Sequence, residues 1–566
     1  MSISLPSARS HRRHASARRA AVLLALLLAL AFFAASTPAK SDERTNARPA
    51  LPEPFLLGGI QVNEADHEDW FEALEAHGFN TVQVTDYAMQ GDWDSAHLWW
   101  DAEAPWVVQE IRGAKRRGLR VVLVLRVAVD HAFERNAFLW HGMIAPTSER
   151  QVRAWFARYE QFARRWAEIA RAEGVDVLMI GSEMNALAST LPLTAPPTLQ
   201  EWFLNDRKQA DRRVRALEER RLLDARRPDP ARPSLAEFTA ELDARIAAER
   251  AWAQRTTGWR AAEVEALAAA RRLASEASIA ADAVVEGTGD PESEALRARA
   301  DAAAADVTAL EAGMLSKLDT RRHLLDSLWR DVIASVRQRF DGPIGYAANF
   351  DQYHEVGFWD ALDVMGVNAY FKLRSQLAPG ELNQPLDAAR RLDLAAELER
   401  GWGAVLDDLA AFRAEHDLDL PLVFTELGYT WRAGSTLEPW ADQGFALIPE
   451  RAPMPSTTGG VPARPVGTEE VAPGSAPAAA SDGELPGRLV VWREQPAREV
   501  ERAMAIEALH RALADPSRPR LSGILYWKLS THAYHRDIES FLIHAGLNSE
   551  DPSLPALRRF RTAPPR

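Results

Sequence analysis

The feature that most constrains the fold is a repeated alternation between short apolar runs and helical segments. Eight runs rich in aliphatic and β-branched residues lie at residues 56–62, 81–85, 120–125, 177–180, 343–348, 363–367, 421–425 and 521–527. Near-continuous apolar runs of this kind are typical of parallel strands that are buried on both faces. Eight strand–helix units predict an α/β fold of the (β/α)8 TIM barrel type.

An open, doubly wound parallel sheet is the alternative architecture, because it uses the same alternation. In dinucleotide-binding sheets a glycine-rich loop follows the first strand, and none follows residue 62. Between the runs, apolar residues recur at helical spacing, as Trp155, Tyr159 and Phe162 do. The barrel therefore remains the preferred prediction.

Two segments interrupt the alternation and divide the barrel into residues 50–197 and 321–566. Residues 198–320 are rich in Ala, Arg and Glu, and Leu235, Phe238 and Leu242 are spaced by three and four positions. This spacing predicts a helical insertion of coiled-coil character after the fourth strand, with its last helix continuing into the barrel. Residues 453–487, after the seventh strand, have the Pro-, Gly- and Ala-rich composition of a disordered loop.

Both insertions follow the carboxyl ends of strands, which form the face where TIM barrels keep their active sites. We expect the helical insertion to shade a site, to mediate self-association or to recruit a protein partner. For the loop at residues 453–487, a tolerated surface insertion without effect on chemistry is an equal alternative.

The N-terminal segment has the pattern of a secretory signal. Residues 11–19 are basic, residues 20–35 are uninterruptedly apolar, and small residues follow before Lys40. This order predicts a signal peptide at residues 1–39 and a secreted or periplasmic protein. The apolar run is short for a bilayer, which takes about 20 residues. A membrane tether that faces the periplasm is the alternative.

Charge and composition exclude several classes of function. The formal net charge is −13, so the basic surface expected of a nucleic-acid-binding protein is absent. The chain has no cysteine, which removes disulfides, thiolate nucleophiles and cysteine-based zinc sites. His532 and His535 form a lone His-x-x-His pair, which is more often polar loop chemistry than a metal site. We therefore expect no catalytic metal and no cofactor.

Two glutamates occupy the positions where a barrel carries chemistry. Glu183 follows the fourth strand in IGSEMN, and Glu426 ends the seventh strand in VFTELGY. Burial makes a charge costly, so a carboxylate at the end of an apolar run calls for a reason. Cleavage of a glycosidic bond needs two carboxyl groups, of which one donates a proton and the other attacks the sugar or activates water. Their pKa values must differ so that one is protonated and the other ionised.

The order of IGSEMN, GVNAYF, VFTELGY and ILYWKLS resembles that of the clan A glycoside hydrolases. Within them the chain is most similar to family 113, the β-mannanase-type TIM barrels, over residues 55–197 and 324–546 without the Pro/Ala-rich loop. The resemblance implies a glycoside hydrolase that cleaves a β-linked polysaccharide or oligosaccharide of the mannan type. It also implies a double displacement with retained configuration.

The same resemblance implies roles for single residues. Glu183 is expected to be the acid/base and Glu426 the nucleophile, Tyr370 to donate a hydrogen bond to the nucleophile, and Trp527 to stack on a sugar. One position departs from the pattern. Many clan A enzymes have an asparagine directly before the acid/base, whereas this chain has Ser182, and this weakens the inference about the substrate more than that about the mechanism.

Further polar and aromatic residues near strand ends are candidate substrate-binding residues. They are Asn185, Asn349, Asp86, Arg126 and Trp140. For Arg126 a buried salt bridge is an equally good interpretation, and for Trp140 ordinary packing is. His141, next to Trp140, lies on the same long loop and could also line the site.

A rival function belongs to another class. A barrel of this sequence could bind glycans, or assemble a cell-envelope complex, without turnover, and the helical insertion keeps this alternative open. Substituting either Glu183 or Glu426 by glutamine separates the two, because only an enzyme loses turnover in both variants.

Overall fold

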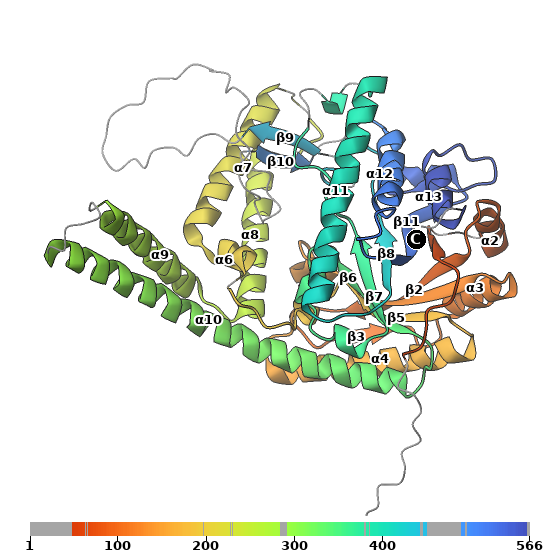
Figure 1. The fold of residues 1–566 in the computed structure, drawn as a ribbon, viewed down its shortest axis with the longest axis horizontal. Helices are drawn as coiled ribbons and strands as arrows, with labels where there is room; N and C mark the ends of the chain where they lie inside the picture. The colour runs from red at the N-terminus through yellow and green to blue at the C-terminus, as the bar shows by residue number, and fades with distance from the viewer. Residues whose placement is uncertain are drawn as a thin grey trace, which may run out of the picture. The chain divides into compact units, whose positions relative to one another are not determined.

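Eight parallel strands close into a barrel in the computed structural model. Around the barrel they follow the order β1, β11, β8, β7, β6, β5, β4, β2, and β2 pairs again with β1 (Figure 1). Their bounds are Leu56–Gln61 (β1), Thr81–Gln90 (β2), Arg120–Val129 (β4), Val177–Ser182 (β5), Ile344–Asn349 (β6), Val364–Ala369 (β7), Leu422–Leu427 (β8) and Leu521–Ser530 (β11). The TIM barrel predicted from the eight apolar runs is confirmed.

The structure describes residues 48–562, apart from 63, 65, 196, 227, 229, 284–290, 378–380, 384, 442–444, 450–487 and 493–494. The predicted signal segment and the Pro/Ala-rich loop at residues 453–487 lie outside the described residues. Within the described ranges, no helix is both long and apolar enough to cross a membrane.

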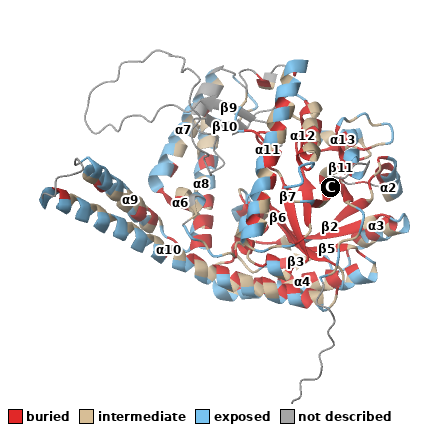
Figure 2. Cartoon of the chain, in the orientation of Figure 1, coloured by how far each residue is buried: buried red, intermediate tan, exposed pale blue. Residues whose placement is uncertain are grey.

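Alternating side chains of the strands build two apolar layers. The barrel interior is filled by a small cluster of Leu56, Val122, Val124, Val177, Met179, Val364, Val423 and Leu525. The opposite faces of the same strands pack with the surrounding helices in a much larger cluster. Burial is therefore concentrated in the strands and on the helix faces that cover them (Figure 2), as the period of two along each strand requires.

Helices alternate with the strands and cover the barrel. They are α2 (His67–Ala76), α3 (Pro105–Arg116), α4 (Glu149–Ala172), α10 (Pro291–Arg337), α11 (Ala388–Glu415), α12 (Glu499–Ala512) and α13 (Ser553–Thr562). The start of α4 follows from its sequence, because the Ser148 side chain accepts a hydrogen bond from the backbone N–H of Gln151. Trp155, Tyr159 and Trp166 of α4 are fully buried against the strands.

Short strands extend the barrel at its edges. β3 (Leu98–Trp100) is antiparallel to β2, and β12 (Ile543–His544) is parallel to β11. β9 (Phe445–Pro449) and β10 (Arg488–Trp492) form a separate antiparallel pair that brackets the segment outside the described residues.

The helical insertion follows β5. After the short helix α5 (Asn185–Ala188), it contains α6 (Thr198–Leu204), α7 (Asp206–Arg226), α8 (Leu235–Thr257), α9 (Ala261–Asp282) and the first part of α10. A capping box between Ser234 and Glu237 starts α8, and Gly258, with a φ of +70°, ends it. As expected from the sequence, α10 is continuous over 47 residues and packs against α9 and then α4 (Figure 1).

An apolar cluster joins the insertion to the loops at the carboxyl ends of the strands. From the insertion it contains Leu204, Trp252, Ala253, Trp259, Val264, Leu267, Met314 and Leu318; from the barrel loops and α5 it contains Trp93, Leu139, Ala145 and Ala186. Because one buried cluster contains residues of both parts, the insertion is packed onto the side of the barrel where the two glutamates lie.

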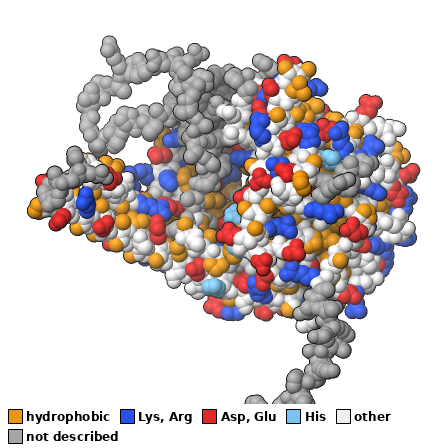
Figure 3. All heavy atoms as spheres, viewed as in Figure 1, with side chains coloured by type: hydrophobic (Ala, Val, Ile, Leu, Met, Phe, Trp, Pro, Cys, Tyr) orange, Lys and Arg blue, Asp and Glu red, His pale blue; other side chains and the backbone are white. Residues whose placement is uncertain are grey.

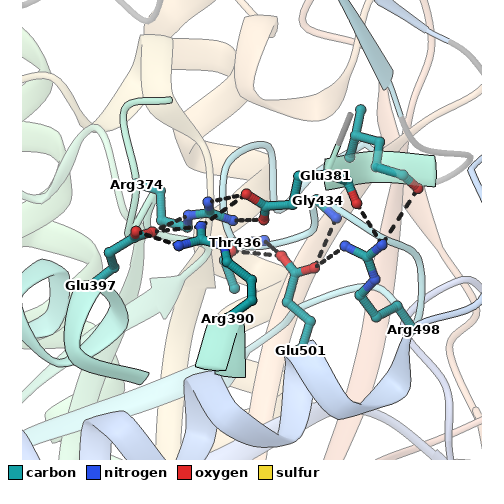
Figure 4. Close-up of polar contacts among 9 residues, drawn as sticks. Arg374, Glu381, Arg390, Glu397, Gly434, Thr436, Arg498 and Glu501 are labelled. Atoms are coloured by element: carbon teal, nitrogen blue, oxygen red, sulfur yellow. Dashed lines mark hydrogen bonds and ion pairs between the residues drawn. The ribbon is translucent and has the colours of Figure 1, made fainter. Parts of the chain in front are cut away.

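A buried ion-pair network fixes the loops that follow β7 and β8 (Figure 4). The Arg374 guanidinium lies 2.6 and 2.9 Å from the two carboxylate oxygens of Glu381, and both side chains are almost fully buried. Glu501, at the start of α12, accepts hydrogen bonds from the backbone N–H of Gly434 at 3.0 Å and the hydroxyl of Thr436 at 2.7 Å. Paired charges of this kind tolerate little rearrangement, so both loops next to β8 are held in place.

Acidic and basic side chains are interspersed over the visible face of the molecule (Figure 3). In that view neither sign forms a separate stripe.

Candidate active site

Glu183 lies where the chain leaves β5. Its φ is +51°, in the left-handed region that few residues other than glycine adopt. The backbone N–H of Glu183 donates to the carbonyl of Ala347 on β6 at 2.9 Å, and the next N–H, that of Met184, donates to the Tyr346 hydroxyl at 2.9 Å. Backbone conformations of this type cluster at functional sites. Glu183 is 8% exposed.

Glu426 reaches the site because the register of β8 is irregular. Val423 belongs to the interior cluster, so simple alternation would turn Thr425 inward and Glu426 outward. The register between β7 and β8 shifts at this point, and Glu426 pairs with Asn368. Irregularities of this kind re-aim side chains next to active sites. Glu426 is 2% exposed.

Two neighbours stabilise Glu426 as a carboxylate. The guanidinium of Arg126, from β4, forms an ion pair with one carboxylate oxygen, and the Tyr370 hydroxyl donates a hydrogen bond to the other at 2.6 Å. Burial and the charge of Glu183 raise the pKa of Tyr370 well above its ordinary value, so this phenol remains a donor. A cation and a donor on the two oxygens favour the charged form.

Glu183 has a different partner. The Nε2 atom of His141 lies 2.9 Å from a carboxylate oxygen of Glu183. Burial raises the pKa of Glu183. The hydrogen bond and charge of His141, together with the charge of Arg126, lower this pKa by more than burial raises it, so the net pKa is below the ordinary value. This result differs from the expectation that burial would keep the acid protonated. The physical reason is His141, which the sequence could not place next to Glu183.

Shared neighbours bring the two glutamates together. Arg126 forms the ion pair with Glu426 and lowers the pKa of Glu183, while Tyr370 binds Glu426 and responds to the charge of Glu183. The two carboxylates predicted at separate strand ends therefore act in one electrostatic environment.

Asn368 is a site residue that the sequence reasoning missed. Its amide donates to the Ser182 hydroxyl at 3.2 Å, and its carbonyl accepts from the Thr425 hydroxyl at 2.7 Å. Ser182 and Thr425 are the residues directly before the two glutamates, so Asn368 ties the ends of β5, β7 and β8 together. Its position two residues before Tyr370 was the available signal. Ser182 is fully buried in this contact.

The two predicted tryptophans lie next to this centre. The Arg126 guanidinium carbon is 4.9 Å from the ring centroid of Trp527, and the Lys528 ammonium is 4.1 Å from it. Trp140 is 40% exposed and makes an edge contact with His141 at 5.0 Å between ring centroids. Both indoles are accessible beside residues that contact the two glutamates.

The remaining candidates are distributed unevenly. Asn185 begins α5, two residues after Glu183, and Asn349 ends β6, where its side-chain oxygen accepts from the backbone N–H of Phe350 at 3.0 Å. Asp86 is not brought to the glutamates. It lies beside Trp166 of α4, and burial raises its pKa to about 7. Val84 packs in the large cluster between the strands and the helices, and side chains two positions apart on a strand point to the same face. Asp86 therefore points to the helices and away from the barrel interior.

The two histidines of the His-x-x-His pair take part in polar contacts at the end of β11. His535 Nδ1 lies 2.7 Å from the Ser530 hydroxyl, which itself donates to Glu64 at 2.6 Å. In the described residues no group of three or more His, Cys, Asp or Glu side chains could hold a metal ion.

Among solved structures the chain resembles a "GH113 beta-1,4-mannanase" (14% identity, 90% of this chain and 100% of that chain, TM-score 0.44). It also resembles the GH113 β-mannanase AaManA of Alicyclobacillus acidocaldarius (15%, 90% and 98%, TM-score 0.44) and a glycoside hydrolase family 5 lichenase of Caldicellulosiruptor sp. F32 (10%, 91% and 97%, TM-score 0.37).

No curated protein matches the chain. The family model of Glycoside Hydrolase Family 113 matches residues 59–190 and 302–447, which include both glutamates, His141, Arg126 and Tyr370. The gap between the two matched segments falls within the helical insertion and the first part of α10. The chain belongs to Glycoside Hydrolase Family 113 and is an O-glycosyl hydrolase.

Proposed function

We propose that this protein hydrolyses β-linked glycans of the mannan type by a double displacement that retains the configuration at the anomeric carbon. The observation that carries the proposal is the difference between the surroundings of the two glutamates. Glu426 is bound by the guanidinium of Arg126 and by the hydroxyl of Tyr370, whereas Glu183 is bound by the imidazole of His141.

These surroundings suit two separate roles. A nucleophile has to be ionised before it attacks, and Glu426 has the environment that favours a carboxylate. An acid/base has to exchange protons in both steps, and the partner that contacts Glu183 at 2.9 Å is the imidazole of His141 and not a guanidinium. In the first step Glu426 attacks the anomeric carbon and Glu183 protonates the departing oxygen; in the second, Glu183 takes a proton from water, which releases the sugar from Glu426.

Three residues would contribute at the reacting position. Trp527 offers an indole face for stacking, and Tyr370 and Arg126 would stabilise the carboxylate that re-forms when the covalent intermediate is hydrolysed. The mannan preference rests on the similarity to family 113, so β-mannan and manno-oligosaccharides are the first substrates to test.

The roles of the two glutamates can be tested by chemical rescue. We expect Glu183→Ala and Glu426→Ala each to lose hydrolysis of manno-oligosaccharides while circular dichroism stays unchanged. With an activated aryl β-mannoside, azide should rescue both variants but give different products. The Glu183→Ala variant should yield the β-glycosyl azide, because its nucleophile is intact, and the Glu426→Ala variant the α-anomer.

Two results would count against the proposal. The same anomer from both variants would contradict the assignment of nucleophile and acid/base. No turnover by the wild-type protein on a panel of β-mannan, β-glucan and xylan would leave only glycan binding without catalysis.

We also propose that the protein is exported, on the basis of the basic, apolar and small-residue order in residues 1–39. Fractionation of bacterial cells that express the full chain should recover it in the periplasm or medium. Recovery in the washed membrane fraction would favour the tether, and recovery of both the full chain and a variant without residues 1–39 in the cytoplasm would contradict export.

A further inference from the structure

Lys528 holds an unusual position next to the candidate active site. It follows Trp527 on β11, at a point where the register with β1 shifts so that Ile60 pairs with Trp527 and Gln61 with Leu529. Lys528 is thus the extra residue of the irregularity. Its ammonium lies 4.1 Å from the centroid of the Trp527 ring, and its side chain is half-buried.

The ammonium of Lys528 has no close anionic partner in the described part of the chain, where no hydrogen bond or ion pair to it is formed. Burial lowers the pKa of Lys528 to about 8; the charge of Glu539 opposes this shift and that of Arg126 adds to it. At neutral pH the side chain is mostly cationic. The contact with the Trp527 ring compensates part of the cost of burying this ammonium, but it leaves the N–H donors of Lys528 able to bind an anion.

The other cation at this place is already engaged. Arg126 also lies over Trp527, at 4.9 Å, but its guanidinium forms the ion pair with Glu426. Lys528 is therefore the positive charge beside Trp527 that remains able to bind a ligand. Because the ammonium lies over the ring of Trp527, a sugar bound at this tryptophan lies close to it.

We propose that Lys528 binds an anionic substituent of the glycan, carried by the sugar at Trp527 or by its neighbour. This inference rests on the proposed function, and it refines the substrate class from β-linked glycans to acidic β-linked glycans. The substituent is either the carboxylate of a uronic acid residue or a sulfate ester, since both offer charged acceptor oxygens to an ammonium.

One argument favours an anion over a sugar hydroxyl. Hydrogen bonds between two charged groups are roughly twice as strong as neutral ones, so the anion gains more from a poorly solvated ammonium. The formal charge of −13 on the chain repels polyanions at long range, so binding of an acidic glycan depends on a local positive charge at the site.

The test compares substrates that differ only in the substituent. β-1,4-Linked manno-oligosaccharides and β-1,4-linked mannurono-oligosaccharides of equal length differ at C6, and sulfated manno-oligosaccharides supply the second anion. The variant Lys528→Met keeps the apolar stem and removes the charge. Lys208→Met, on the exposed face of α7, removes the same charge away from the site and is the matched control.

Two readouts separate binding from catalysis. The first is kcat/KM for each oligosaccharide, and the second is the affinity of each for the Glu183→Gln protein, with and without Lys528→Met. We expect the wild type to prefer one of the acidic substrates. We also expect Lys528→Met to lower kcat/KM and affinity for that substrate about ten-fold more than for the neutral one. Lys208→Met should lower kcat/KM and affinity equally for all substrates, or leave both unchanged.

Other outcomes overturn the inference. If the wild type hydrolyses manno-oligosaccharides but neither binds nor hydrolyses the acidic ones, the proposed function stands and the anion site does not exist. If Lys528→Met lowers the affinity and kcat/KM for neutral and acidic substrates to the same extent, Lys528 binds a hydroxyl and not an anion. If no oligosaccharide is either bound or hydrolysed, the inference and the proposed function fail together.

Discussion

The ion pair between Arg126 and Glu426 allows a prediction about stability and activity together. In the variant Arg126→Met the apolar part of the side chain is retained, but the guanidinium is lost. The two side chains are 6% and 3% exposed, so Glu426 would remain buried with Tyr370 as its remaining close partner. Removing one member of a buried pair costs about 3–5 kcal/mol, because the other charge stays desolvated.

The expected change in melting temperature follows from the size of the chain. Unfolding entropy is about 2.1 cal/mol/K per residue, or about 1 kcal/mol/K for the roughly 460 residues that the structure describes. The loss therefore corresponds to a fall of about 3–5 °C in the melting temperature, which differential scanning fluorimetry or circular dichroism resolves. Activity should fall at the same time, because Glu426 loses the cation that favours its carboxylate form.

A double variant tests the reason for the loss. In Arg126→Met/Glu426→Gln no buried charge is left unpaired, so this protein should melt above Arg126→Met although it is inactive. Arg112→Met is the matched control, since its pair with Glu173 is exposed on the arginine side (57%) and should contribute less than about 1 kcal/mol. If the double variant loses as much as the two single variants combined, the electrostatic explanation is refuted.

Three further predictions concern neighbouring groups. Tyr370→Phe removes the 2.6 Å hydrogen bond to Glu426 and should lower kcat/KM about ten- to hundred-fold; an unchanged value would contradict its role. His141→Leu should raise the pKa of Glu183 and shift the alkaline limb of the pH profile of kcat/KM to higher pH. An unshifted limb would contradict the effect of His141 on the pKa of Glu183. Asp86 has a pKa of about 7 when folded, so its contribution to stability is full below about pH 4 and is lost as the pH rises to 7. Asp86→Asn should therefore raise the melting temperature at pH 8 but not at pH 4.

The barrel itself could be predicted from the sequence because each strand is signalled locally. Apolar runs such as residues 120–125 and 177–180 are long enough to identify, and the polar residues after them mark one end of the barrel. The positions of Glu183 and Glu426 on β5 and β8 followed from this pattern. Tyr370, predicted from its place in GVNAYF, does contact Glu426.

What the sequence could not give depends on register and on long-range contacts. Simple alternation turns Glu426 outward, and only the irregularity between β7 and β8 brings it to Arg126. Asp86 was expected at the site because it follows an apolar run. It lies two positions after Val84 on β2, however, so its side chain points to the same face as Val84 and contacts α4. For Arg126 the two interpretations left open by the sequence are both compatible with the structure, since its salt bridge is made with the candidate nucleophile.

The contact between His141 and Glu183 shows why the helical insertion belongs to the scaffold of the site. His141 lies between Leu139 and Ala145, and Ala186 follows Glu183 in α5; these three apolar residues pack in one cluster with Trp252 and other residues of the insertion. Both sides of the contact at 2.9 Å therefore rest on the same buried surface. Because close-packed clusters transmit small displacements, removing the insertion would expose this surface and alter the partner that controls the pKa of Glu183. An independent surface insertion would have its own core, whereas this one shares its core with residues on either side of His141 and with Ala186, which follows Glu183.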